Sequence, residues 1–249
     1  MAAGKFGPAS VFFFVDGFNL ISQKLKGIRE KSTSPVEDVT GLGDSSQVND
    51  PVGVTSIEVT QEGAYFDTTA TTGGHVAFAG NIPTSAQASQ RVMCLGMAGA
   101  TTGYAFTGFQ GTYSNEYEVL AESGNLTKAN VTFAMTGSRD AGKIIQPLAA
   151  KTASWNTEST PVDNAASTSG GGVGYLQCTA ASGFSAFTGQ LKESSDDVTY
   201  AAFINFSNNV SAPFAERSEM SGTVQRYVAF TGTVTGSGSI TVFCGFSRS

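Results

Sequence analysis

The chain consists of short runs in which apolar and polar residues alternate, separated by glycine-containing steps such as Thr-Gly and Gly-Ser. One example is Ile240, Val242 and Cys244, which follow Gly236-Ser237-Gly238-Ser239 at a spacing of two residues. Successive side chains of a β-strand point to opposite faces, so this spacing is typical of half-buried strands, and glycine permits turns between them. The 249 residues include 30 glycines and 56 serines and threonines, which favours a mainly β protein with a structural or binding role.

The composition argues against most catalytic and metal chemistry. The single histidine, His75, lies in the polar stretch Thr72-Gly73-Gly74-His75-Val76, where we predict an ordinary exposed or half-buried side chain. Nucleophilic triads normally need histidine as the general base. Cys94, Cys178 and Cys244 are far apart and form no Cys-x-x-Cys pair, so we predict buried free thiols of a reducing cytoplasm and no zinc site. We assign no catalytic, cofactor-binding or metal-binding residue.

Length and charge limit the architecture and the partners. A chain of this size suits one large β domain or two of roughly 100 to 125 residues. Apolar residues make up 40% of it, whereas only 14% is charged and the net charge is −6, which disfavours binding to nucleic acid or anionic lipid. The apolar run 11–15 is too short for a membrane span and lacks a signal-peptide pattern. We therefore expect no membrane anchor and no export.

The first half is predicted to be β with one helix. Residues 11–15 indicate a buried strand that ends in the turn Asp16-Gly17. Residues 32–53 hold two prolines, three glycines and no sustained periodicity, which predicts a long loop. This loop is either an arm that a neighbouring subunit orders or an unattached surface loop. A short helix is expected over 83–91.

Charges near the N-terminus form two adjoining groups of opposite sign. Lysines and an arginine come first and acids follow: Lys24, Lys26, Arg29 and Lys31, then Glu37, Asp38, Asp44 and Asp50. Two solvated loop faces are one interpretation. Complementary patches that meet between identical subunits are the other.

The second half is predicted to be all-β. Residues 156–172 are rich in Ser and Gly and predict a linker between a first domain, 1–155, and a C-terminal domain, 173–249. Gly236-Ser237-Gly238-Ser239 predicts a hairpin between strands at 223–235 and 240–246. Ala-Phe-Thr-Gly occurs at 105–108, 186–189 and 229–232, which we interpret as a strand-exit device with Phe inward and Gly at the turn. An old duplication of two β halves is the alternative.

Two further groups of residues are interpreted as structural elements without a catalytic or binding role. Glu193, Asp196 and Asp197 have the setting of an acidic hairpin turn rather than of a glycosidase pair or a calcium loop. The run Gly170-Gly171-Gly172-Val173-Gly174 lacks the Lys-Ser/Thr ending of a phosphate-binding loop and leads into a strand.

Several phrases resemble those of tail tube proteins of tailed phages. In the first half they are Phe14-Val15-Asp16-Gly17-Phe18-Asn19-Leu20, Val39-Thr40-Gly41-Leu42-Gly43-Asp44-Ser45 and Val59-Thr60-Gln61-Glu62-Gly63-Ala64-Tyr65-Phe66-Asp67. In the second half, Gly172 to Gln177, Glu193 to Tyr200 and Arg226 to Phe246 are similar to the C-terminal β domain of that group.

The resemblance implies a mainly β fold: a tail-tube-like β-sandwich or barrel with one short flanking helix, plus a second β-sandwich-like half. It also implies a virion protein made in the bacterial cytoplasm, whose rings stack into the DNA conduit of a non-contractile tail. Its partners would be copies of itself and the tape measure, tail terminator and distal tail proteins, and an acidic lumen would let DNA pass without specific binding. The alternatives are a capsid decoration protein or a carbohydrate-binding surface module. An enzyme is not expected.

Overall fold

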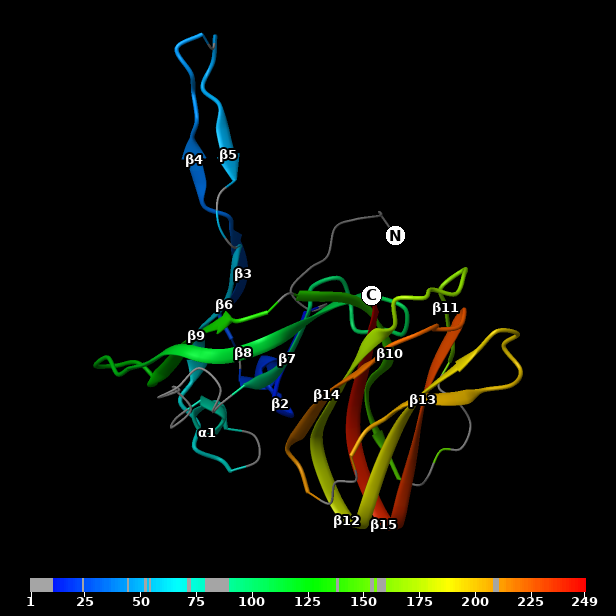
Figure 1. Cartoon of the computed structure of the whole chain (residues 1–249). Helices are drawn as coiled ribbons and strands as arrows, with labels where there is room; N and C mark the ends of the chain where they lie inside the picture. Colours follow the sequence, from blue (N-terminus) through cyan, green and yellow to red (C-terminus); the bar gives the residue numbers. More distant parts are fainter. Residues whose placement is uncertain are drawn as a thin grey trace.

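The structure, a computed structural model, describes residues 11–23, 25–43, 45–51, 53, 55–70, 73–78, 90–137, 139–152, 155, 160–207 and 211–249. These residues form one 13-stranded antiparallel sheet, a two-stranded ribbon, a 3₁₀ turn at Leu20–Gln23 and the short helix α1 (Gly74–Phe78) (Figure 1). The strands are β1 (Phe12–Val15), β2 (Phe18–Asn19), β3 (Gly27–Thr33), β4 (Val36–Asp38), β5 (Asn49–Pro51), β6 (Ser56–Tyr65), β7 (Arg91–Gly96), β8 (Ala105–Leu120), β9 (Lys128–Met135), β10 (Arg139–Lys151), β11 (Val162–Asp163), β12 (Gly172–Ser194), β13 (Ala201–Asn205), β14 (Phe214–Met220) and β15 (Tyr227–Arg248).

The predicted fold class is confirmed: the protein is mainly β, is β-sandwich-like and has one short helix among the described residues. The described strands do not close into a barrel. The helix lies at 74–78 and contains His75, whereas the helix predicted over 83–91 falls mostly on residues 81–89, outside the described part of the chain.

The first core lies against a curved set of strands in the order β1-β7-β8-β9-β6-β3. Strand β9 shows the alternation that builds it, because Val131 and Phe133 are buried while their neighbours on the strand are half-buried. The Phe133 ring meets Phe13 of β1 and Phe78 of α1 edge-on, at ring centroid distances of 6.0 and 5.7 Å. The helix therefore packs on this core.

The second core is formed by one long ribbon that folds back on itself. Strands β12 and β15 pair from Gly172 opposite Arg248 to Ser194 opposite Tyr227. In a straight strand Gly174 and Leu191 would lie roughly 55 Å apart, at about 3.3 Å per residue. Instead, a Cβ on Gly174 would lie 2.7 Å from Cδ1 of Leu191. Breaks in pairing register and the positive φ of Gly183, +71°, mark the bend.

The folded ribbon makes two layers with apolar side chains between them. The first layer is the N-terminal part of β12 and the C-terminal part of β15, flanked by β14 and β10. The second is the remainder of both strands, flanked by β13 and β11. Buried side chains from both layers, such as Leu176 and Leu191, belong to one core. This arrangement is a small β-sandwich.

The predicted terminal hairpin is wrong. Residues 227–235 and 240–248 do not pair with each other; both are parts of β15, and both pair with β12. Glycines at 236 and 238 allow the whole ribbon to bend, with Gly236 at a φ of +103°. The partner that fixes this outcome is β12, a strand distant in the chain and beyond the reach of a local turn rule.

The Ala-Phe-Thr-Gly device is half correct. Its three phenylalanines are buried, as predicted. Its glycines, however, lie inside strands instead of at turns. Each lies under an aromatic ring, and a larger side chain at that position would collide with the ring. A Cβ on Gly108 would lie 2.3 Å from the ring of Tyr175, one on Gly189 3.0 Å from Phe230, and one on Gly232 2.3 Å from Trp155.

A third core joins the two halves of the chain. It contains Phe12 and Phe14 of β1 together with Tyr175 of β12 and Phe243 of β15. Strand β1 is therefore buried on both faces, since Phe13 belongs to the first core. The predicted buried strand at 11–15 is confirmed over Phe12–Val15.

Residues 160–172 lie along the sheet. Strand β11 pairs with β15, Thr168 forms a bridge with Val224, and the Ser249 amide donates to the Gly171 carbonyl at 3.1 Å. Both halves of the chain contribute strands to one continuous sheet. The division into 1–155, 156–172 and 173–249 stays a prediction.

Candidate functional site

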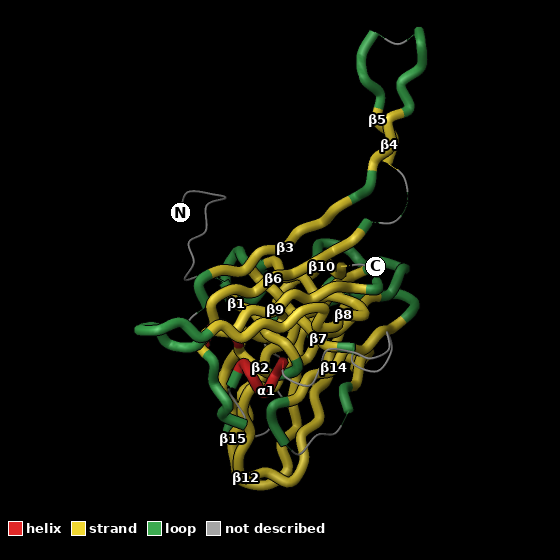
Figure 2. Tube along the Cα trace, turned by 90° about the vertical axis from the view of Figure 1, so that its left-hand side faces the viewer, coloured by secondary structure: helices red, strands yellow, loops and turns green. Residues whose placement is uncertain are grey.

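The long loop predicted over 32–53 is a β-hairpin arm. Strands β3 and β6 pair up to Thr33 opposite Ser56, and β4 and β5 continue the ribbon outward (Figures 1 and 2). We call residues 34–55 the arm. All of its described residues are exposed. The predicted long loop is thus corrected in one respect, because it contains the short paired strands β4 and β5.

Side-chain hydrogen bonds hold the outer part of the arm together. The Asp38 carboxylate accepts hydrogen bonds from the hydroxyl of Thr40, from its amide at 3.0 Å, and from Nε2 of Gln47 at 3.1 Å. Thr40 Oγ1 in turn accepts from the Val48 amide at 2.9 Å. The bonds from Thr40 lower the pKa of Asp38 below its usual 3.8. The carboxylate thus serves to fix the turn.

The arm presents apolar side chains and acids to solvent. Val36 is 62% exposed and Leu42 113% exposed. Glu37 and Asp50 lie directly opposite each other in the β4–β5 register, an arrangement that is destabilising for like charges. An isolated two-stranded hairpin is marginally stable in water. These features together are typical of a segment that a binding partner covers.

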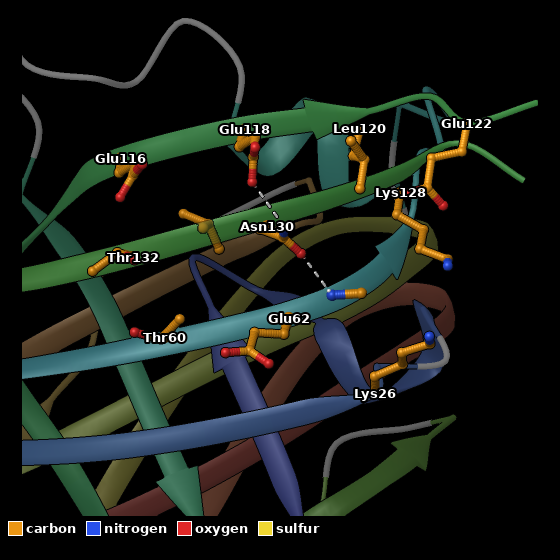
Figure 3. Close-up of a pocket in the computed structure, with 12 residues that line it drawn as sticks. Lys26, Thr60, Glu62, Glu116, Glu118, Leu120, Glu122, Lys128, Asn130 and Thr132 are labelled. Carbon is orange, nitrogen blue, oxygen red and sulfur yellow. Dashed lines mark hydrogen bonds between the residues drawn. The ribbon is translucent and has the colours of Figure 1, made fainter.

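A second surface feature is an acidic hollow across β6, β9 and β8 (Figure 3). We call this the acidic face. Its volume is about 490 Å³, and four glutamates against two lysines line it: Glu62, Glu116, Glu118 and Glu122, with Lys26 and Lys128. The face therefore carries net negative charge.

Asn130 organises the centre of the acidic face. Its Oδ1 accepts from the Gly63 amide at 2.8 Å and its Nδ2 donates to Oε2 of Glu118 at 3.1 Å (Figure 3). The Arg29–Glu62 pair at its edge, 3.5 Å apart, is more than half exposed on both sides and contributes about 1 kcal/mol at most. The site has fixed shape at its centre and solvated charges at its edge.

The chemistry-bearing residues singled out in the sequence are not brought together. His75 is half-buried, as predicted; its Nδ1 lies 2.7 Å from the Tyr117 hydroxyl, and its ring lies on Phe66. The three cysteines are buried free thiols, as predicted. Burial raises the pKa of Cys178 to about 12 and raises the pKa values of Cys94 and Cys244.

The acidic turn after β12 is confirmed as a turn. Asp196 accepts from the amides of Thr199 and Val198, both at 3.0 Å, and from the Ser194 hydroxyl at 2.8 Å. These bonds lower the pKa of Asp196 to about 2. Glu193 accepts from the Gln225 amide at 2.7 Å. Both carboxylates hold backbone, so neither is positioned as a free acid or base.

Metal-binding and membrane-spanning features were the other site classes considered from the sequence. The described residues contain no group of three or more His, Cys, Asp or Glu side chains that could hold a metal ion. Within the same part of the chain, no helix has the length and apolar character needed to cross a membrane.

Similarity to known proteins is found among solved structures. No protein-family model matches the sequence, and no curated protein matches it. Among solved structures, the chain is similar to SPP1 Dit (gp 19.1), described as a paradigm of the hub adsorption apparatus in phages that infect Gram-positive bacteria. The identity is 13%, the match covers 95% of this chain and 98% of that chain, and the TM-score is 0.31.

Proposed function

We propose that the protein is a structural subunit of a phage tail, and that its copies assemble into stacked rings forming the tube of a non-contractile tail. The observation that carries the proposal is the arm, an exposed ribbon with apolar side chains that no other described part of the chain covers. The resemblance of the Asp16-Gly17 and Tyr65-Phe66-Asp67 phrases to tail tube proteins indicates the kind of assembly. The protein would act by forming a conduit, without covalent chemistry.

The acidic face suits the inner surface of such a conduit. Phosphate carries negative charge, so a wall with net negative charge repels DNA and lets it slide. The tape measure, tail terminator and distal tail proteins would be further partners, and the protein would reside in the virion tail.

Electron microscopy of the concentrated protein tests the proposal, with open tubes as the expected result. The arm-deletion variant, which replaces residues 34–55 by Asn-Gly, is compared with the wild type. Since Thr33 and Ser56 are direct partners, a two-residue turn can close β3 onto β6 and leave the body folded. This variant should remain a folded monomer at concentrations where the wild type polymerises.

Proteolysis provides a second measurement. Residues 32–53 contain no lysine or arginine, so a protease that cleaves after glutamate, acting at Glu37, is the appropriate probe. Cleavage should be fast in the free subunit and slow in tubes. Equal cleavage in both states, or soluble trimers that bind expanded capsids or glycans, would contradict the proposal.

A further inference from the structure

An apolar groove lies at the start of β3, the strand that leads into the arm. It has a volume of about 300 Å³, and the apolar side chains that line it are Val11, Ile21, Leu25, Ile28 and Met97. Val11, Ile21, Leu25 and Ile28 are partly buried and pack against the first core, which holds the base of the groove in place. Met97 is 43% exposed at its edge. The groove can therefore bury a large apolar side chain without rearrangement of the body.

The charge of the groove is opposite to that of the arm. Lys26 is the charged residue that lines the groove. The segment 32–53 has acids and no basic residue, and Glu37 and Asp50 lie opposite each other with no cation between them in the sequence of the arm. A lysine beside these two carboxylates would relieve their repulsion. The arm therefore offers apolar side chains that can fill the groove and negative charge that can pair with Lys26.

The arm of the same chain does not reach this groove. The groove includes Gly27 and Ile28 at the start of β3, whereas Leu42 lies 14 residues beyond Ile28 along a paired ribbon. Pairing of β3 with β6 and of β4 with β5 directs the tip away from the body (Figures 1 and 2). An arm that fills this groove must therefore come from another molecule.

We infer that the groove receives the arm of a second copy, with Leu42 in the groove and Lys26 near Glu37 and Asp50. This inference rests on the proposed function and names the surface that the arm binds. Arm and groove are different surfaces, so the contact is head-to-tail: each copy donates one arm and accepts one. Such contacts propagate into closed rings or open stacks and do not stop at a dimer.

Cross-linking between two single-cysteine variants tests the inference. Leu42→Cys and Met97→Cys are mixed under conditions of assembly and treated with a short bismaleimide. The three native cysteines are fully buried and should not react. A covalent dimer is expected when both variants are present and not with either alone. The matched control is Leu126→Cys in place of Leu42→Cys, since Leu126 is also an exposed leucine at the end of a hairpin, 67% exposed.

A charge exchange provides an independent readout. Lys26→Glu should raise the concentration needed for assembly at least tenfold, and Asp50→Lys in the same chain should restore it. Self-cross-linking of Leu42→Cys would show arm-to-arm pairing and overturn the inference, as would an equal yield with Leu126→Cys. Tubes that form without the Leu42–Met97 product would show that the groove does not bind the arm, and the proposed function would stand. If the wild-type chain does not polymerise, the proposed function itself is contradicted.

Discussion

The amide of Gly17 donates a hydrogen bond to Oε1 of Gln177 across 160 positions of sequence, at 2.7 Å. Nε2 of Gln177 donates to the Val92 carbonyl at 2.9 Å, so this one side chain joins the β1–β2 turn and β7 to β12. Asp16 completes the connection by accepting from Arg91 and from the Val92 amide. The Asp-Gly phrase thus holds the two halves of the molecule together.

Replacement of Gly17 by alanine should destabilise the protein by about 3 kcal/mol. Gly17 has a φ of +85°, and a Cβ there would lie 2.5 Å from both the Cys178 carbonyl oxygen and the Phe214 amide nitrogen. The left-handed backbone costs about 1–2 kcal/mol, and displacement of packed neighbours a further 1–3. The free energy of unfolding from urea titration measures the loss.

Gly103→Ala is the matched control for Gly17→Ala. Its φ of +83° is almost the same, but no heavy atom lies within 4 Å of its added Cβ. It should lose only the backbone contribution, about 1–2 kcal/mol. Similar losses in the two variants would show that the close approach of the β1–β2 turn to β12 is not what requires glycine at position 17.

Local patterns predicted the elements well where one face is buried. The run 11–15 was recognisable because both faces of β1 enter cores, and Val131 and Phe133 alternate because β9 has one buried face. The arm escaped this test. Neither of its faces is buried, so nothing imposes alternation on its strands. A usable signal was the pair of valine-flanked acidic runs around Val36 and Val48.

Strand pairing was the part that local sequence could not provide. The alternation of Ile240, Val242 and Cys244 correctly indicated a strand, but its partner is the distant stretch around Cys178. Likewise, Gly232 resembles a turn residue until the ring of Trp155 is placed above it. The sequence was also silent about the groove, because its lining comes from segments around Val11, Ile21 and Met97 that only the fold brings together.

Replacement of Gly232 by alanine should change the environment of Trp155. An added Cβ would lie 2.3 Å from the indole ring. The backbone cannot easily separate the two residues, because the Trp155 amide donates to the Gly232 carbonyl at 3.0 Å. The ring must move or the strand must shift, at a cost of about 1–3 kcal/mol. Trp155 is the sole tryptophan, so its fluorescence reports the change directly. Gly124→Ala, whose added Cβ has no heavy atom within 4 Å, should leave the emission spectrum unchanged.

The native thiols should be inert in the folded protein. Burial raises the pKa of Cys178 to about 12, so its thiolate is scarce at pH 8, and all three side chains are closed to reagents. A chromogenic disulfide reagent at pH 8 should detect no thiol in native protein and three in denaturant. Leu42→Cys should add one thiol that reacts at once. Rapid labelling of the wild type would contradict the burial and would invalidate the cross-linking design.

Acidification should loosen the arm before it unfolds the body. Because hydrogen bonds from Thr40 hold the pKa of Asp38 below 3.8, the folded tip prefers the ionised carboxylate. The stabilisation is complete above the unfolded pKa and is lost as the pH falls through the lower, folded value. Amide exchange at Val48, whose N–H donates to Thr40, should therefore lose protection below about pH 4 while β9 stays protected. Asp38→Ala should expose the Val48 amide already at neutral pH, and an unchanged exchange rate would show that this carboxylate does not order the tip.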